Sequence, residues 1–457
     1  MRGTLLLAGV AYLATQSHAS DLQRPAPGFY RWQEDWSMLA DPGRRSEPGD
    51  ALKYIPLSPD DPHRYLSLGV TLRERFESND AVLFGVGTVN DEYLLHRLEL
   101  HADAHITDRA RLFVQLENAL APGREHRSVV DANHADLRLA FVDIGDSLGN
   151  GAWKVRLGRQ EVAFDLQRFA SVRDGANVRQ AFDALWAQYE QEHWLASVFL
   201  SQPVQYSNDE AFDDRGSGHF TFRGTRVRGH FRDAGQVSAT FSEFSLDSAH
   251  FLSASGNERC RSLDVHYGDR ANGFDWDVEG IAQRGSVGSH AIRAWAIGSI
   301  AGYTFGTAWQ PRVSLQFDAA SGDEDPSDRR IGTFNPLFPN GYYVTQSGYT
   351  GYSNLIHFKQ TVTFAPAPAV RVLGGVGELW RQTTHDAVYA QPIAPVARTA
   401  GQGDRYTATY LQLRAEWTPH RNLAFAFEAN HYFVSSAIRN VGGGDAQYVA
   451  LEVRWGW

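Results

Sequence analysis

The feature that most constrains the fold is a two-residue alternation of apolar and polar side chains that recurs along the chain. It is clearest at residues 449–457, where every odd position is apolar, polar or small residues lie between, and the run ends on Trp457. Because successive side chains of a strand point to opposite faces, this pattern predicts a strand with one apolar and one wet face. The same alternation occurs at 66–76, 94–106 and 356–364.

Eighteen such strands are expected, an even number, as a barrel with both chain ends on one side requires. The strands expected at 220–231 and 370–382 alternate less cleanly than the others. The expected ranges are 65–77, 93–107, 109–119, 134–144, 153–162, 182–190, 193–203, 220–231, 235–246, 258–268, 273–284, 290–303, 308–318, 354–365, 370–382, 405–418, 422–434 and 446–457.

The connections between these strands alternate in length. Tight links are expected at 107–108, 191–192, 232–234, 365–369 and 419–421, and long ones at 120–133, 163–181, 204–219, 319–353 and 383–404. Barrels of the bacterial outer membrane have short periplasmic turns and longer external loops. The sequence therefore predicts an all-β fold, a single transmembrane antiparallel barrel over residues 65–457.

The N-terminal 64 residues lack the alternation. Arg2, an apolar stretch over 4–14 and small residues ending at Ala19 predict a signal peptide over 1–19. Residues 20–64 are rich in proline and charge, but Trp32 and Trp36 are too apolar to stay in solvent. We expect residues 20–64 to form a periplasmic segment that packs at the barrel mouth or enters the lumen.

Composition excludes several classes of protein. No apolar run beyond the N-terminus reaches the roughly 20 residues of a membrane helix. The formal net charge is -10, which argues against a nucleic-acid partner. The single cysteine, Cys260, allows no internal disulfide. Phosphate-loop, zinc-protease and serine-nucleophile motifs are missing from the sequence, so we expect no cofactor and no metal site.

A family resemblance begins at Tyr30-Arg31-Trp32-Gln33-Glu34-Asp35-Trp36-Ser37. It is most specific at Leu157-Gly158-Arg159-Gln160-Glu161, followed by Arg168, Arg173, Asn177 and Phe182-Asp183. In these segments the sequence resembles the alginate-export family of outer-membrane porins. The resemblance implies an eighteen-stranded barrel whose arginine-rich lumen passes an anionic polymer. The alginate exporter itself also has a long periplasmic loop that closes the pore, whereas every periplasmic turn expected here is short, which favours a general channel of the family.

Strand alternation sends many charged side chains inward. Of the 43 basic residues, only Lys53, Lys154 and Lys359 are lysine, and arginine binds carboxylates in a two-pronged geometry. Residues expected on the solute path are Arg73, Arg75, Arg97, Arg111, Arg138, Arg156, Arg159, Arg168, Arg173, Arg179, Asp275, Asp277, Glu279, Arg414 and Arg454. They predict a basic wall, contributed by the first strands, that faces an acidic wall on the strand at 273–284. The alternative is that the charges pair across neighbouring strands.

Residues 163–181 carry Arg168, Arg173 and Arg179 between two strands. They either fold into the pore as a constriction or form an external loop held by local ion pairs.

These features predict a passive outer-membrane channel for anionic solutes, with uronate-containing (alginate-like) oligo- or polysaccharides as candidates. Its expected partners are outer-membrane lipid, an anionic sugar or carboxylate solute, and the outer-membrane assembly machinery, which would read the terminal Trp457. The alternative is a barrel-type outer-membrane hydrolase with a serine and histidine site on the outer wall.

Overall fold

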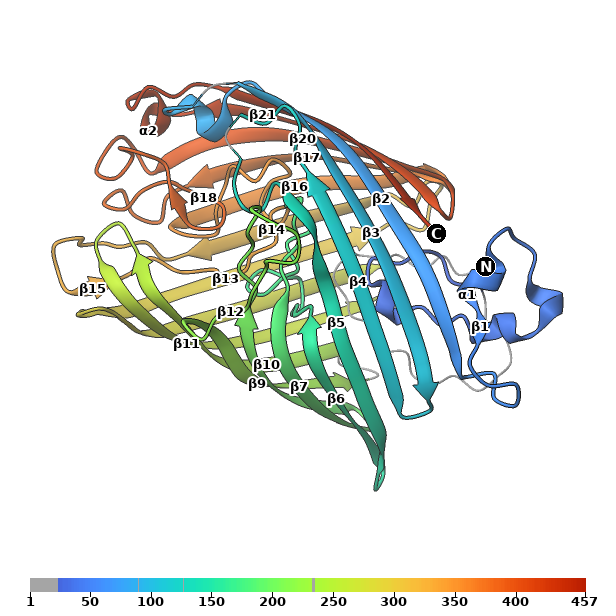
Figure 1. Cartoon of the computed structure of the whole chain (residues 1–457). Helices are drawn as coiled ribbons and strands as arrows, with labels where there is room; N and C mark the ends of the chain where they lie inside the picture. Colours follow the sequence, from blue (N-terminus) through green and yellow to red (C-terminus); the bar gives the residue numbers. More distant parts are fainter. Residues whose placement is uncertain (1–23, 89, 126, 232–234) are drawn as a thin grey trace.

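The computed structural model describes residues 24–88, 90–125, 127–231 and 235–457, in which antiparallel strands close into a barrel (Figure 1). The sheet has twenty strands, and all but the two-residue strands β1 and β15 form the wall. The eighteen wall strands are β2 (Tyr65–Asn79), β3 (Asp91–Thr107), β4 (Ala110–Leu120), β5 (Asn133–Leu148), β6 (Gly151–Gln160), β7 (Phe182–Gln191), β8 (Trp194–Pro203), β9 (Phe220–Phe231), β10 (Gly235–His250), β11 (Ser255–Ala271), β12 (Phe274–Val287), β13 (His290–Thr304), β14 (Arg312–Ala320), β16 (Leu355–Ala367), β17 (Val370–Trp380), β20 (Tyr406–His420), β21 (Leu423–Val434) and β22 (Ala446–Gly456).

The remaining elements are short. β1 (Ile55–Pro56) pairs with β2, and β15 (Arg330–Ile331) pairs in parallel with β13. β18 (Tyr389–Ala390) and β19 (Ala394–Pro395) pair with each other. The helical turns are η1 (Arg31–Gln33), η2 (Ser37–Ala40), η3 (Pro42–Arg44), α1 (Asp50–Lys53), η4 (Val82–Gly85) and α2 (Ser436–Arg439). Among the described residues, no helix is long and apolar enough to cross a membrane.

The first and last wall strands close the barrel. β2 pairs with β22 in antiparallel register, from Thr71 opposite Gly456 to Asn79 opposite Tyr448. Closure removes the free strand edges that would otherwise template aggregation. The C-terminal alternation therefore belongs to the closing strand, and the predicted all-β barrel of eighteen strands is confirmed.

Each predicted strand overlaps one wall strand, in the same order along the chain. Short turns gather at the end where the labels N and C lie in Figure 1, and the long connections lie at the other end. Two of the external connections, 251–254 and 288–289, are also short. The predicted alternation of loop length is therefore less regular around β10–β13, whose strands extend for 14 to 17 residues.

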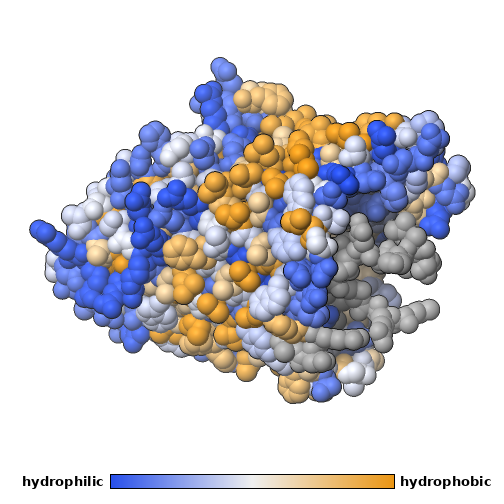
Figure 2. Space-filling model, turned by 90° about the horizontal axis from the view of Figure 1, so that it is seen from below, coloured by the Kyte–Doolittle hydropathy of each residue, from blue (hydrophilic) through white to orange (hydrophobic). Residues whose placement is uncertain are grey.

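Large apolar side chains are exposed around the outside of the wall, among them Leu263, Phe241 and Trp295, which are 45% to 52% exposed. Figure 2 shows a hydrophobic band between hydrophilic surfaces at the two ends of the molecule. Such a band is the surface that a membrane barrel presents to lipid.

The segment before the barrel, residues 24–64, contacts the lumen at the short-turn end. The guanidinium of Arg31 donates to the carbonyl oxygens of Val70 (3.1 Å) and Trp457 (2.9 Å). The ring of Trp32 meets Phe141 of β5 edge-on at 6.2 Å between centroids. Aromatic residues of this segment therefore lie among inward-facing side chains, while the predicted signal peptide lies outside the described residues.

Candidate functional site: a constricted lumen

Residues 161–181, here called the crossing segment, connect β6 to β7 through the inside of the barrel. On one side the carboxylate of Asp174 binds Arg97 of β3 at 2.7 Å and Arg454 of β22 at 3.2 Å. Half-way round the ring, Arg168 binds Asp277 at 2.7 Å and Glu279 at 2.8 Å, both on β12. Of the two arrangements left open by the sequence, the segment folds into the barrel and does not form an external loop.

Further contacts hold the crossing segment between these anchors. The side-chain amide of Asn177 donates to the carbonyl oxygens of His96, Leu120 and Asp131 at 3.0 to 3.1 Å. Asp165 binds Arg226 of β9 at 2.6 Å. Burial alone would raise the pKa of Asp174, but nearby guanidinium groups, Arg454 and Arg97 foremost, outweigh it and hold that pKa well below its usual range.

The long connection between β14 and β16 packs against the crossing segment. Phe338 donates its backbone N–H to the carbonyl of Phe169 at 3.0 Å, and Asn340 does the same to Gln167 at 3.0 Å. The ring of Phe338 also meets Phe182 edge-on at 5.0 Å. Two connections from opposite sides of the barrel therefore obstruct the lumen together.

Nearly all the residues predicted to lie on the solute path form ion pairs. The exception is Arg173, which donates to the carbonyl of Leu337 at 2.8 Å and whose pKa burial lowers to about 10. The pairs on the wall are Arg73–Glu452, Arg75–Glu428, Arg111–Asp103, Arg156–Asp143, Arg159–Asp183, Arg312–Asp275, Arg414–Glu416 and Arg454–Glu452. Those made with the crossing segment are Arg97–Asp174, Arg454–Asp174, Arg138–Glu161, Arg179–Glu99, Arg168–Asp277 and Arg168–Glu279.

This pairing corrects the prediction of a basic wall facing a separate acidic wall. Arg111 and Arg156 bind carboxylates on the adjacent strand, at 2.5 Å and 2.6 Å. A buried guanidinium without a counter-charge is costly, and the neighbouring strand supplies the nearest carboxylate. The three acids predicted for the acidic wall all lie on β12. Asp275 binds Arg312 of β14, and Arg168 of the crossing segment binds Asp277 and Glu279.

A cavity of about 190 Å³, here called the vestibule, lies beside the crossing segment. Its lining includes the N-terminal segment and inward side chains of β6 to β12. The basic residues that line it are Lys154, Arg156, Arg226 and Arg228, and the aromatic ones are Tyr30, Trp32, Phe164 and Trp186.

The carboxylates of the vestibule are engaged by protein groups. Glu161 accepts hydrogen bonds from Arg138 at 2.8 Å and from the indole of Trp32 at 3.1 Å. Asp165 pairs with Arg226, and Asp277 with Arg168 and His266.

Lys154 and Arg228, by contrast, form no ion pair with any acid of the described chain. The vestibule therefore carries uncompensated positive charge next to aromatic surface.

Sequence reasoning missed Arg226 and Arg228. Their strand, β9, was one of the two that alternate poorly, because its outward positions near the external end are Thr221 and Arg223 rather than apolar residues. Once β9 is paired with β10, even-numbered residues point inward, as the burial of Phe222 and Arg226 shows.

Two groups of carboxylates in the described chain have oxygens within 4.8 Å of one another and could hold a cation. Asp136, Asp213 and Asp214 lie near the external loops, where burial raises the pKa of Asp214 to about 6. Asp165, Asp264 and Glu279 form the second group, and Asp165 lines the vestibule. The bases Arg226 and Arg168, which bind Asp165 and Glu279, compete with a cation at the second group.

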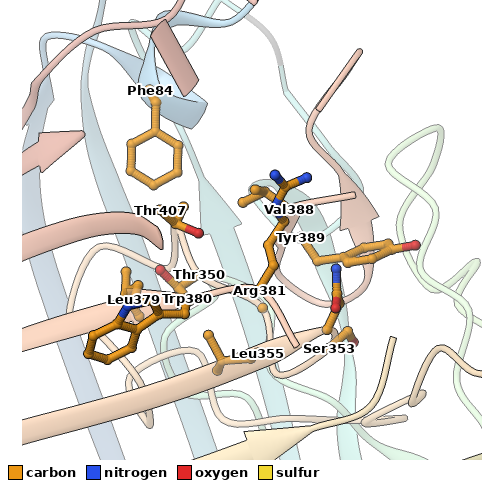
Figure 3. Close-up of a pocket in the computed structure, with 12 residues that line it drawn as sticks. Phe84, Thr350, Ser353, Leu355, Leu379, Trp380, Arg381, Val388, Tyr389 and Thr407 are labelled. Atoms are coloured by element: carbon orange, nitrogen blue, oxygen red, sulfur yellow. The ribbon is translucent and has the colours of Figure 1, made fainter. Parts of the chain in front are cut away.

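A second, much smaller cavity of about 10 Å³ lies at the external end (Figure 3). Arg381 lies at its centre, but its guanidinium donates to the carbonyl oxygens of Thr399 at 2.7 Å and Asp404 at 2.7 Å. This arginine orders the connection between β17 and β20, and its terminal N–H groups are occupied by backbone carbonyl oxygens.

The family of this chain follows from a comparison with known proteins. The family model described as "Alginate export" matches residues 64–452. The chain belongs to the alginate export family. The assignment to an outer-membrane channel agrees with the lipid-facing band and the closed barrel. No curated protein matches the sequence of this family member.

Solved structures similar to this chain are outer-membrane barrels of Pseudomonas aeruginosa. OccK2 (OpdF) in complex with glucuronate has a TM-score of 0.58 at 12% identity, covering 86% of this chain and 97% of that one. OpdK with vanillate has a TM-score of 0.58 at 10% identity, covering 86% and 98%. OccD3 (OpdP) has a TM-score of 0.57 at 12% identity, covering 89% and 93%. At these identities the likeness shows the shared fold.

Proposed function

We propose that this protein is a constricted, passive channel that admits small carboxylate anions, with uronates as the leading class. The observation that carries the proposal is the vestibule, where Lys154 and Arg228 form no ion pair with a described acid and line the same cavity as Trp186 and Trp32. Arginine and lysine bind carboxylates through charge-assisted hydrogen bonds, and aromatic faces pack against sugar rings or aromatic acids.

The size of the vestibule favours a small solute. Its volume of about 190 Å³ is below the roughly 300 Å³ at which pockets for drug-sized ligands begin. The structures of OccK2 with glucuronate and OpdK with vanillate support the same class, because each of those ligands is a small carboxylate on a similar barrel. An alginate-like polymer would have to pass the crossing segment one residue at a time.

We also propose roles for the two ends of the chain. Residues 1–19 direct export, and residues 20–64 narrow the periplasmic mouth through Trp32 and its neighbours. Trp457 serves as the signal for the assembly machinery. It also takes part in closing the barrel, since its backbone N–H donates to Val70 at 2.8 Å.

Current through single channels in planar bilayers tests the function. We expect glucuronate to block the potassium chloride current at concentrations where glucose, a neutral sugar of the same ring size, has no effect. Equal block by both sugars would mean that the channel does not recognise the carboxylate group. A barrel that inserts but carries no current would contradict the channel itself.

A further inference from the structure

A row of arginines crosses the outer face of the barrel near its external end. Arg223 of β9, Glu243 of β10, Arg261 of β11, Arg284 of β12 and Arg293 of β13 are directly opposite one another in the strand register. All four arginines are exposed on the outside of the wall. Side chains directly opposite in an antiparallel pair have Cβ atoms about 4.5–5.5 Å apart, so these residues form one continuous lateral row.

The row carries excess positive charge, because it contains four arginines and one glutamate. Glu243 lies between Arg223, at 2.5 Å, and Arg261, at 2.9 Å. Neither Arg284 nor Arg293 forms an ion pair within the described chain. Like charges directly opposite on a sheet are destabilising, and three adjacent strands here carry Arg261, Arg284 and Arg293. An external anion would relieve that repulsion.

The row runs along the edge of the hydrophobic band. The outward residues one step toward the membrane are Thr225, Phe241, Leu263, Ala282 and Trp295, again in direct register. Phe241, Leu263 and Trp295 are among the exposed apolar side chains, and tryptophan prefers the membrane interface. The arginines therefore begin where the apolar surface ends.

The height of the row matches the outer lipid headgroups. On β13, Tyr303 lies in an aromatic cluster with Phe274 and Phe305 at the periplasmic end. From Tyr303 to Arg293, a rise of about 3.3 Å per residue and a tilt of about 40° give a height of about 25 Å, which is that of the apolar band of such barrels.

We infer that this row binds the phosphate groups of a phosphorylated glycolipid in the outer leaflet of the membrane. Arginine binds phosphate in a bidentate manner, and the row offers several guanidinium groups at the depth of a lipid headgroup. Charge complementarity and continuity with the lipid-facing band favour a lipid over a soluble anion. This surface is on the outside of the barrel and is independent of the lumen.

The test uses the full chain in zwitterionic detergent, with bisphosphorylated lipid A and its dephosphorylated form as probes. We expect the phosphorylated form to bind and raise the thermal unfolding midpoint, and the dephosphorylated form to do neither. The triple variant Arg261→Gln/Arg284→Gln/Arg293→Gln should lose affinity by about tenfold or more. The matched triple Arg398→Gln/Arg405→Gln/Arg439→Gln removes the same charge from exposed external positions and should bind as the parent does.

A second readout needs no lipid. Without phosphorylated lipid, the row variant should unfold at a higher temperature than the parent, because three repelling charges are gone. If the row triple folds poorly, Arg284→Gln alone repeats both measurements. The inference is overturned if the row variant keeps its lipid affinity or unfolds earlier without lipid. It is also overturned if inorganic phosphate or phosphatidylglycerol has the same effect at equal phosphate concentration.

Discussion

Two groups of cations inside this barrel differ in what lies opposite them. Arg97 and Arg168, which anchor the crossing segment, each meet a carboxylate at 2.7 Å. Lys154 and Arg228 in the vestibule meet none in the described chain. The first group has its charge cancelled locally and positions a piece of backbone. The charge of the second group is not cancelled, so its electrostatic field can attract an anionic solute in the water-filled passage.

The difference shows that the number of lumen arginines is a poor measure of selectivity. Most of the arginines predicted to lie on the path are structural, because burial of a guanidinium requires a partner. The residues that set selectivity are the few whose partners are missing. Four predictions test this division, beginning with the one of largest expected effect.

Replacing residues 164–178 with a short glycine–serine linker removes both anchors of the crossing segment. We expect single-channel conductance to rise several-fold, because one of the two connections that occupy the lumen is removed. The same replacement at 383–397, in an external connection, should leave conductance near that of the parent. Conductance unchanged by the first replacement would mean that the crossing segment is not the constriction.

Asp174→Asn removes the carboxylate that binds Arg97 and Arg454. Arg97 and Arg454 then share no carboxylate, and removing one partner of a buried ion pair costs about 3–5 kcal/mol. Urea unfolding of the refolded barrel in vesicles measures the loss. Asp445→Asn, whose partner Arg439 is exposed, should cost only about 0–1 kcal/mol. Equal costs for the two variants would contradict the anchoring role.

Lys154→Gln/Arg228→Gln removes the unpaired group. We expect the glucuronate concentration for half-block to rise about tenfold, as the loss of roughly 1.4 kcal/mol of binding predicts. The barrel should remain as stable as the parent, since no ion pair is lost. An unchanged glucuronate concentration for half-block would mean that Lys154 and Arg228 do not form the binding site.

The last prediction concerns the pH dependence of the N-terminal segment through Lys53, whose ammonium group donates to the carbonyl of Leu68 at 2.7 Å. Burial first, and then the charge of Arg31, lower the pKa of Lys53 to about 7. The unfolded chain therefore binds more protons between pH 7 and about 10.4, so docking of residues 24–64 should strengthen as pH rises through this range, by at most about 1.4 kcal/mol per pH unit. Hydrogen exchange of the segment, corrected for intrinsic rates, measures this slope, and Lys53→Met should remove it. Protection that weakens as pH rises would contradict the assignment.

The sequence was sufficient for the barrel and insufficient for the charge pattern of its lumen. Period-two alternation places most wall strands clearly and β9 and β17 less clearly, because side chains that face lipid are apolar. Alternation predicts that the side chains of Arg97 and Arg156 point into the lumen. It does not predict which carboxylate each of them binds there. Register pairs Arg156 with Asp143 of β5, and only the folded crossing segment brings Asp174 to Arg97.

The vestibule was beyond sequence reasoning for a related reason. Lys154 and Arg228 lie 74 positions apart and meet the same cavity only after the wall curves between β6 and β9. Their importance comes from lacking a partner, which no single sequence position can show.

The most direct test of the account is the reversal potential across a bilayer with a potassium chloride gradient. The parent channel is predicted to be anion-selective, and Lys154→Gln/Arg228→Gln to shift its reversal potential toward the cation side. The control variant Arg109→Gln/Arg270→Gln removes two exposed charges near the periplasmic turns. Its reversal potential should equal that of the parent. A parent that prefers cations, or a vestibule variant that reverses where the parent does, would contradict the claim that unpaired vestibule cations set selectivity.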